Sequence, residues 1–398
     1  MQADVTILGG GPVGATLALL LARATSRPER IVLCRPRRPA VVSADTTADP
    51  RSMALNHGSR VLLASLGAWP AGGADILHVH VSQKGRLGRT HISHADFGVP
   101  ALGTVVPYPG IVEALDAALA LSGITIRAGE PAAILRQEGD AAVVGQDGQD
   151  GQDGQEWTTR ACVHAEGGTF DHQARNDLHR DYGQHAVLAI VRASRPRPGW
   201  AWERFTTEGP LALLPYPAGP AHDTGRYALV WCCRPGHAER LAALDDGAFA
   251  DALGRTFGTR LGGFAAAGPR HRYPLGINLR RHVVDGVTVA IGNAAQTLHP
   301  VAGQGMNLGL RDAARLAESL APLLRDPSAR AAPLLSAYAR ARGADRWLTS
   351  GLTDFMPRIF ATGLAPVEHA CGLALLGLDV SRTLRGPLAR QLMEGLRA

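Results

Sequence analysis

A glycine-rich turn near the start of the chain constrains the fold more than any other feature of the sequence. It reads Gly9-Gly10-Gly11-Pro12-Val13-Gly14, the GxGxxG pattern that closes a strand and opens a helix. In this pattern Gly9 permits the tight turn, Gly11 lets a pyrophosphate approach the backbone, and Gly14 lets the helix pack closely on the strand. Free N–H groups at the start of the helix attract phosphates. The motif therefore predicts a dinucleotide site.

The residues on either side of the turn predict a Rossmann-like βαβ unit. Val5–Leu8, Gly14–Ala24 and Arg30–Leu33 have the patterns of a strand, a helix and a strand. Folds of this kind usually carry Asp or Glu at the end of the second strand, where a carboxylate binds the ribose hydroxyls. Cys34 occupies that position here. A thiol is a weak acceptor, so we expect adenosine to be bound more weakly than in a carboxylate-bearing site.

A second glycine-rich segment lies near residue 300. An apolar β-run at Val287–Ile291 leads into Gly292-Asn293-Ala294-Ala295-Gln296-Thr297-Leu298-His299-Pro300-Val301-Ala302-Gly303-Gln304-Gly305-Met306-Asn307. A helix is expected from Asn307 to Leu324, and its positive dipole end would face the turn. In a reduced flavin, the group that would face this dipole end is the anionic edge of the ring. An ordinary capped helix explains one glycine of this segment but not the whole string.

The rest of the chain indicates an α/β protein of two packed domains, as the length of 398 residues also favours. Helices are expected at 59–66, 111–121 and across 333–397. Strands are expected at 76–82, 141–144, 156–163, 186–191, 202–206, 211–215 and 227–232. A Gly/Gln/Asp repeat over 145–155 is best explained as the flexible tip of a hairpin.

Charge and cysteine content exclude several classes of protein. The net charge is +6, but the basic residues are scattered and all are arginine except Lys84, which does not fit nucleic-acid binding. A basic face that favours an anionic membrane surface stays open as an alternative. Five cysteines without a CxxC spacing fit reduced thiols in a cytoplasmic protein. The longest apolar run, Val13–Ala22, is half a membrane span.

The two glycine-rich segments, together with Asp49–Leu55, resemble the flavin aromatic hydroxylases of the para-hydroxybenzoate hydroxylase type. The string from Gly292 to Asp312 is similar to the ubiquinone-biosynthesis branch, the 2-polyprenyl-6-methoxyphenol hydroxylases. Asp181–Ala186, Trp202–Phe205 and Gly209–Pro215 also match that branch. The resemblance spans essentially the whole chain.

The resemblance implies a discontinuous FAD-binding domain with an inserted β-sheet. We assign 1–75, 100–180 and 280–335 to the FAD-binding domain, 76–99 and 181–279 to a β-rich substrate domain, and 336–398 to a C-terminal helical region. In the family the middle motif is Ala-Asp-Gly, but this chain has Glu166 in place of the Asp. The cofactor-binding residues that we expect are Gly9, Gly11, Pro12, Val13, Gly14, Cys34, Arg51, Glu166, Gly292, Asn293, Gly303, Gln304, Gly305, Met306 and Asn307.

The chemistry that the resemblance implies needs no side-chain triad. Non-covalent FAD, reduced by NAD(P)H or another transient electron donor, would react with O₂ to give a C4a-hydroperoxide that a prenylated phenol attacks. The backbone at Pro300, Gly303 and Gly305 would position the flavin in this reaction. Other ubiquinone-biosynthesis proteins and the inner face of a bacterial membrane are open as further partners. The alternatives are a flavin oxidoreductase without oxygenation and an assembly subunit with a degenerate FAD site.

Other side-chain patterns carry weaker predictions. His78 and His80 alternate on one strand, but no third ligand is suggested nearby, so no metal site is predicted. No GxSxG nucleophile motif occurs. Trp200-Ala201-Trp202 lacks the Ile-Pro of the flavin halogenases. For His299, beside Pro300, a structural role and a place near the substrate are both open.

Overall fold

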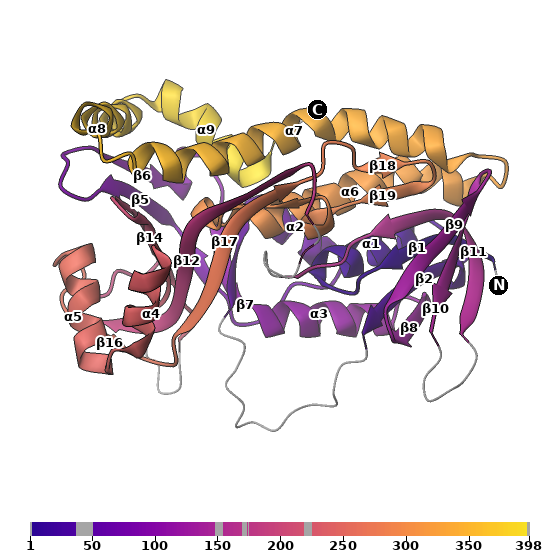
Figure 1. The fold of residues 1–398 in the computed structure, drawn as a ribbon, viewed down its shortest axis with the longest axis horizontal. Helices are drawn as coiled ribbons and strands as arrows, with labels where there is room; N and C mark the ends of the chain where they lie inside the picture. Colours follow the sequence, from indigo (N-terminus) through magenta and orange to yellow (C-terminus); the bar gives the residue numbers. More distant parts are fainter. Residues whose placement is uncertain are drawn as a thin grey trace.

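The computed structural model describes residues 2–36, 51–147, 154–168, 173, 175–218 and 225–395 (Figure 1). Its first sheet has a parallel centre with the strand order β8 (Thr125–Gly129), β2 (Ile31–Pro36), β1 (Gln2–Leu8), β11 (Gln155–His164) and β19 (Thr288–Ala290). The short strand β18 (Val284–Asp285) adds an antiparallel edge. Six of the seven residues of β1 are buried, as expected for a strand covered on both faces. The predicted α/β fold is confirmed.

Helices cover one face of this sheet. Helix α1 (Pro12–Arg23), built largely of Ala and Leu, contacts both α3 (Tyr108–Ala120) and α6 (Gln304–Arg325). Beyond β11 the sheet continues antiparallel through β10 (Ala141–Gln146) and β9 (Ala132–Glu138). Gln146 pairs with Gln155, so the predicted hairpin is confirmed. Residues 148–153 of its repeat lie outside the described part.

A second, mixed sheet makes the β-rich half of the molecule. Its order is β20 (Gln296–Thr297), β17 (His271–Leu279), β12 (Leu178–Ala193), β15 (Arg226–Cys233), β14 (Gly209–Pro215), β13 (Trp200–Thr206), β5 (His78–Gln83) and β6 (Arg89–Ser93), with β16 (Phe264–Ala266) on β12. One face is buried under α4 (Pro235–Ala243) and α5 (Asp246–Phe257), with Trp202 and Trp231 in the interior.

A small sheet and the C-terminal helices join the two halves. The small sheet contains β3 (Ser52–Asn56), β7 (Gly103–Pro107) and β4 (Ala74–Ile76), and α2 (His57–Ser65) follows β3. Helix α7 (Ala331–Phe360) contacts α6 as well as β13 and β14, and α8 (Ala365–Val380) and α9 (Arg382–Glu394) follow it (Figure 1). No helix in the described ranges is both long and apolar enough to span a bilayer.

One predicted helix start needs correction, and two elements cross the predicted domain limits. Helix α6 begins at Gln304, before the expected Asn307, because the left-handed turn ends at Gly303. The predicted domain boundary at residue 335 falls inside α7, whose first turn is already buried at Ala331 and Leu335. Strand β20, in the segment assigned to the FAD-binding domain, pairs with β17 of the second sheet. We still propose the same division into domains, because the two large sheets otherwise follow it.

Candidate functional site

Two glycines of the first turn are required by the protein itself. Gly9 has φ +114°, and a Cβ there would lie 2.5 Å from the carbonyl oxygen of Ala165. A Cβ on Gly14 would collide with the carbonyl oxygen of Gly9. The turn is also tied to β2, since the Gly9 N–H donates to the Cys34 carbonyl at 2.9 Å. These contacts are the close helix–strand packing that the motif predicts.

Gly11 is different, because nothing in the described part of the chain explains its lack of a side chain. Its φ of −72° suits any residue, and a Cβ there would meet no atom within 4 Å. Gly11 is also the N-cap of α1, where no side chain caps the helix and no acidic residue occupies the first turn. The first N–H groups of α1 therefore face open space beside a position kept free of side chain. A phosphate fits both features.

The second glycine-rich loop repeats this arrangement at α6. Ala302 (φ 57°) and Gly303 (φ 60°) are consecutive left-handed residues, and Ala302 is the one non-glycine with positive φ in the described ranges. A left-handed alanine costs roughly 1–2 kcal/mol. Gly303 is the N-cap of α6, without a side-chain cap, and a Cβ on Gly305 would meet nothing within 4 Å. Strain concentrated at an open helix N-terminus is typical of a ligand site.

The starts of α1 and α6 lie close together because the residues between the two helices are glycines, which have no side chain. A Cβ on Gly292 would lie 3.2 Å from the side chain of Val13, and one on Gly309 would lie 2.7 Å from it. Helices α1 and α6 therefore approach closely at Val13, and their uncapped N-termini share one side of the parallel sheet. A cofactor with a pyrophosphate and an anionic ring edge, as FAD has, fits this pair of helix ends.

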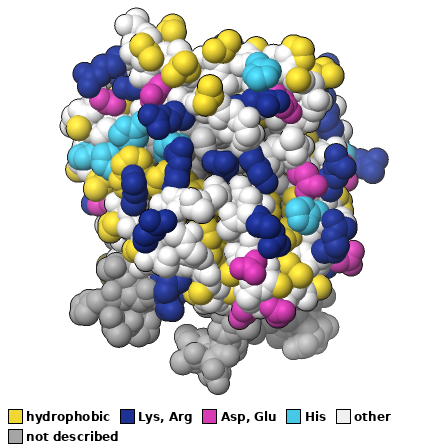
Figure 2. Space-filling model, turned by 90° about the vertical axis from the view of Figure 1, so that its left-hand side faces the viewer, with side chains coloured by type: hydrophobic (Ala, Val, Ile, Leu, Met, Phe, Trp, Pro, Cys, Tyr) yellow, Lys and Arg dark blue, Asp and Glu magenta, His cyan; other side chains and the backbone are white. Residues whose placement is uncertain are grey.

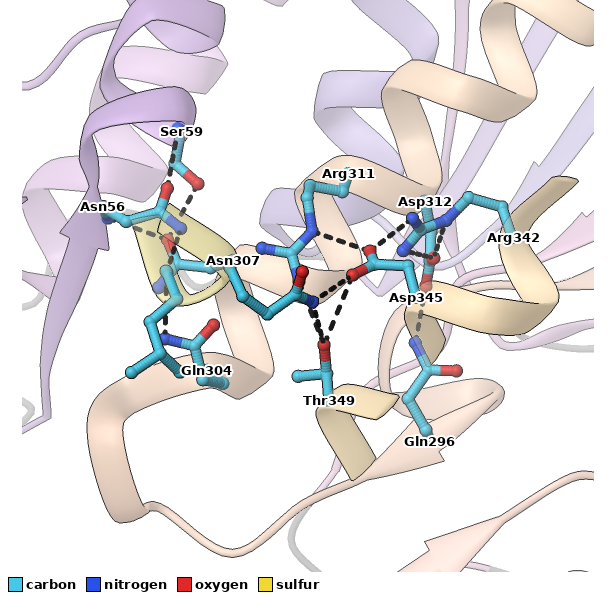
Figure 3. Close-up of polar contacts among 12 residues, drawn as sticks. Asn56, Ser59, Gln296, Gln304, Asn307, Arg311, Asp312, Arg342, Asp345 and Thr349 are labelled. Atoms are coloured by element: carbon cyan, nitrogen blue, oxygen red, sulfur yellow. Dashed lines mark hydrogen bonds and ion pairs between the residues drawn. The ribbon is translucent and has the colours of Figure 1, made fainter. Parts of the chain in front are cut away.

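Two side chains of the loop that we expected to bind the cofactor are engaged by protein. Asn307 accepts hydrogen bonds at Oδ1 from the Asn56 N–H (2.9 Å) and the Ser59 hydroxyl (2.8 Å). Its Nδ2 donates to the carbonyls of Ala54 (2.9 Å) and Gly303 (2.8 Å). Gln304 donates from Nε2 to Ala302 and to Leu392, while its buried Oε1 has no partner among the residues that the structure describes (Figure 3). Asn307 thus fixes the loop on β3, and it has only its main chain left for a cofactor.

A buried ionic network holds the base of the same loop. The Asp312 carboxylate is fully buried, and it accepts from the Gly292 N–H (3.3 Å) and from Gln296 Nε2 (2.5 Å). Its other oxygen accepts two bonds from the Arg342 guanidinium at 2.9 and 2.8 Å. Arg342 also pairs with Asp345, which accepts from Arg311 (Figure 3). The network joins the start of the loop, α6 and α7 into one unit.

His299 has a structural role in this loop. The Val301 N–H donates to His299 Nδ1 at 3.2 Å, so Nε2 carries the proton and faces Gln184 Oε1 at 3.3 Å. Burial lowers the pKa of His299 to about 3, which keeps the ring neutral. The ring also meets the Tyr182 ring edge-on, with centroids 5.3 Å apart. These contacts set the direction of the chain on either side of Pro300.

The remaining predicted residues lie around the end of the parallel sheet. Cys34 is buried in β2, which continues to Pro36 and not, as predicted, only to Leu33, and burial raises the pKa of its thiol to about 12. Exposed Glu166 lies close enough to Cys34 to act on it electrostatically. Asn293 donates to the Gly168 carbonyl at 3.4 Å. The Arg51 guanidinium lies 4.1 Å from the centre of the Tyr108 ring. The structure therefore brings the second loop and the middle motif together, and it leaves each residue's contact with a cofactor as a proposal.

Sequence reasoning missed the residues that hold the loop from behind. Asp312 closed the motif that carried the family resemblance, but no role was predicted for it. Its partner Arg342 and the second carboxylate bound by Arg342, Asp345, lie in α7, about 30 residues further along. A buried Asp at the inward position of an amphipathic helix was the signal that could have found this network.

Comparison with known proteins shows which of them share this sequence and this fold. A family model described as "FAD binding domain" matches residues 2–349. Ubiquinone hydroxylase UbiL of Rhodospirillum rubrum is 33% identical over 98% of this chain and 88% of its own length. The 3-demethoxyubiquinol 3-hydroxylase of Escherichia coli is 28% identical over 96% of each chain. The p-nitrophenol 4-monooxygenase PnpA of Pseudomonas putida shares the fold at a TM-score of 0.75 and 14% identity, over the whole of both chains.

Proposed function

The chain belongs to the FAD-binding domain family, and we propose that it is an FAD-dependent monooxygenase that hydroxylates the ring of a polyprenylated phenol in ubiquinone biosynthesis. The observation that carries the proposal is the pair of uncapped helix N-termini at Gly11 and Gly303, on two helices that pack together where Gly309 of α6 meets Val13 of α1. The names of the two ubiquinone hydroxylase relatives support the substrate class.

Each loop has a separate task in this proposal. The N–H groups at the start of α1 hold the pyrophosphate of FAD, and those at the start of α6 stabilise negative charge on the reduced ring. When bound, FAD supplies oxygen transfer from O₂, driven by electrons from NAD(P)H or another donor. The sequence contains a single GxGxxG, so the donor visits transiently. The Asp312 network and Asn307 keep the second loop in place while the first loop stays fixed by its own glycines.

We propose further that α8 and α9 lie against the membrane surface that supplies the prenylated substrate. Leu373 is 68% exposed and Val380 is 79% exposed, and Leu376, Leu384 and Leu87 are also exposed. Figure 2 shows hydrophobic side chains along the upper margin of this end of the molecule, with Lys and Arg side chains beneath them. Exposed apolar groups beside cations suit an anionic lipid surface.

The test uses the purified, FAD-loaded protein with NAD(P)H. An ortho-prenylated phenol should be hydroxylated with one O₂ consumed per product, and 4-hydroxybenzoate should not react. Acid precipitation should release the flavin into the supernatant, since the cofactor is non-covalent. Turnover of the charged benzoate but not of the prenylated phenol would refute the substrate class.

The same preparation separates the alternatives. A flavin oxidoreductase would reduce its substrate under argon, where the monooxygenase forms no product. An assembly subunit would be isolated without stoichiometric flavin and would bind none when FAD is added.

A further inference from the structure

One carboxyl group interrupts an otherwise apolar row that crosses five adjacent strands of the second sheet. Directly paired residues share one face of a sheet, and the pairings run from Leu188 to Val230, Ala212, Glu203 and Val81. These five residues, which we call the open row, lie on the adjacent strands β12, β15, β14, β13 and β5. Glu203 is its only polar member.

The face that carries the open row is less covered than the opposite face. On β12 the opposite-facing Val187 and Ala189 are buried under α4 and α5, whereas Leu188 between them is partly exposed. Val230, Glu203 and Val81 are also partly exposed, although they lie on interior strands of the sheet. Apolar side chains that an interior strand leaves partly uncovered are the floor that an apolar ligand needs.

Side chains at two places on this face connect it to the second glycine-rich loop, around Pro300. Phe205, two residues from Glu203 and on the same face, packs with Val301 next to Pro300. On the other side, Cys232 belongs to an apolar cluster against which Tyr182 packs, and the Tyr182 ring contacts His299. Same-face neighbours on a strand are about 7 Å apart, which is roughly the length of a substituted phenol ring. A phenol on the open row would therefore lie between Glu203 and the loop.

Glu203 itself makes no hydrogen bond or ion pair with any residue in the described ranges. Desolvation by the surrounding protein raises its pKa to about 7. A carboxyl group placed among apolar side chains without a partner is unfavourable for folding, so a role in ligand binding is the better explanation.

On the basis of the proposed function, we infer that the Glu203 carboxylate binds the hydroxyl group of the phenol substrate and takes its proton as the ring is oxygenated. The proton moves from the phenol oxygen to the carboxylate, and the electron pair of the O–H bond stays on that oxygen. This pair raises the electron density of the ring. The ring becomes aromatic again when the hydroxylated carbon loses its own proton to solvent and Glu203 returns its proton to the phenol oxygen. Glu203 is then a catalytic residue, and it selects phenols over rings without a hydroxyl group.

Few other charges face this carboxyl group. The Cys232 thiol lies near it, and burial raises the pKa of that thiol far above its usual range, so it stays neutral. Asp354 and Arg358 on α7 are paired with each other, and Asp354 also accepts from the Tyr182 hydroxyl. His271 pairs with Leu188 at the far end of the row, four strands or about 19 Å from Glu203. Arg204 points to the opposite face, as alternation along β13 requires.

The experiment measures phenol ionisation directly. FAD-loaded wild type, Glu203→Gln and the control Glu208→Gln are titrated with 2-geranyl-4-nitrophenol, whose phenolate absorbs visible light, from pH 5.5 to 9. Glu208 lies on the β13–β14 turn and pairs with His237, so it is a matched carboxylate outside the open row. Wild type and Glu208→Gln should bind the phenolate at least tenfold more weakly than the phenol, because a second negative charge meets Glu203. In Glu203→Gln this discrimination should fall below twofold.

Turnover of the ortho-prenylated phenol gives a second readout. In the wild type kcat should rise through an ionisation near pH 7, while Glu203→Gln should lose that rise and about 10²-fold in kcat. Equal discrimination and equal pH profiles in wild type and Glu203→Gln would overturn the inference. A wild type that binds FAD and shows the discrimination, but hydroxylates no phenol, would instead refute the proposed function and keep Glu203 as a phenol-binding group.

Discussion

Replacing Glu203 by Gln should make the substrate-free protein more stable at neutral pH. The native pKa of about 7 lies above the ordinary 4.5 of an unfolded chain. The unfolded state therefore loses its proton first, and stability falls as the pH rises from about 4.5 to 7. The difference between the two pKa values corresponds to about 3 kcal/mol. Since the side chain is partly exposed, solvent screening reduces this to about 2–3 kcal/mol.

Urea denaturation of the FAD-saturated protein at pH 5 and pH 8 measures this effect, because saturating FAD keeps the ligand contribution constant. At pH 8 the Glu203→Gln variant should exceed the wild type by about 2–3 kcal/mol, and at pH 5 by under about 1 kcal/mol. Glu208→Gln corrects for the loss of a carboxyl group in general, and it should not reproduce the gain. A difference between Glu203→Gln and wild type that is the same at both pH values would show that Glu203 is an ordinary solvated acid, and the reasoning would fail.

Four further predictions follow from the site. Gly11→Val should fold normally, since its side chain meets no protein atom, but should lose FAD as measured by flavin absorbance; full occupancy would overturn the cradle assignment. Asp312→Ala should lower the free energy of unfolding by about 3–5 kcal/mol, because the buried Arg342 guanidinium then keeps only Asp345 and the Gly292 N–H and Gln296 amide lose their acceptor; a thermal shift near zero would contradict this. Cys34→Glu should lower the Kd of FAD by roughly one to two decades in a fluorescence titration; an equal or higher Kd would show that the side chain does not face the ribose. A variant with both Leu376→Asp and Val380→Asp should co-sediment less with phosphatidylglycerol vesicles; undiminished binding would show that another surface of the protein contacts the membrane.

Local patterns were enough to predict the fold and the two loops. A strand precedes and a helix follows the glycines in both segments, Gly9 to Gly14 and Gly292 to Asn307, so local patterns identify the two loops, although distant residues such as Cys34 and Asn56 hold them in place. The start of α6 was misplaced by three residues because the left-handed conformation of Ala302 is not encoded in its residue type. Alanine rarely adopts that conformation, and no local pattern announces it.

The supporting residues could not be predicted, because they depend on distant pairings. Asp312 needs Arg342, which lies on another helix, and the register of α7 against α6 is visible only in three dimensions. Glu203 was noticed as part of a motif, but its isolation follows from the pairing of four strands around it. A sequence shows that a carboxyl group is present, and only the fold shows that no residue in its described part pairs with it.

The late position of β19 and α6 in the chain has a consequence for synthesis in the cell. Strands β1 and β11 are complete by His164, yet the next strand on β11, β19, ends only at Ala290, and α6, which covers α1, ends only at Arg325. About 160 residues must be made in between, which takes roughly 8–30 s at ordinary translation rates. During that time the parallel sheet has an unpaired edge and α1 an uncovered apolar face. The nascent chain should therefore depend on a chaperone at the ribosome, and ribosomal pausing between these two points should lower the yield of folded protein.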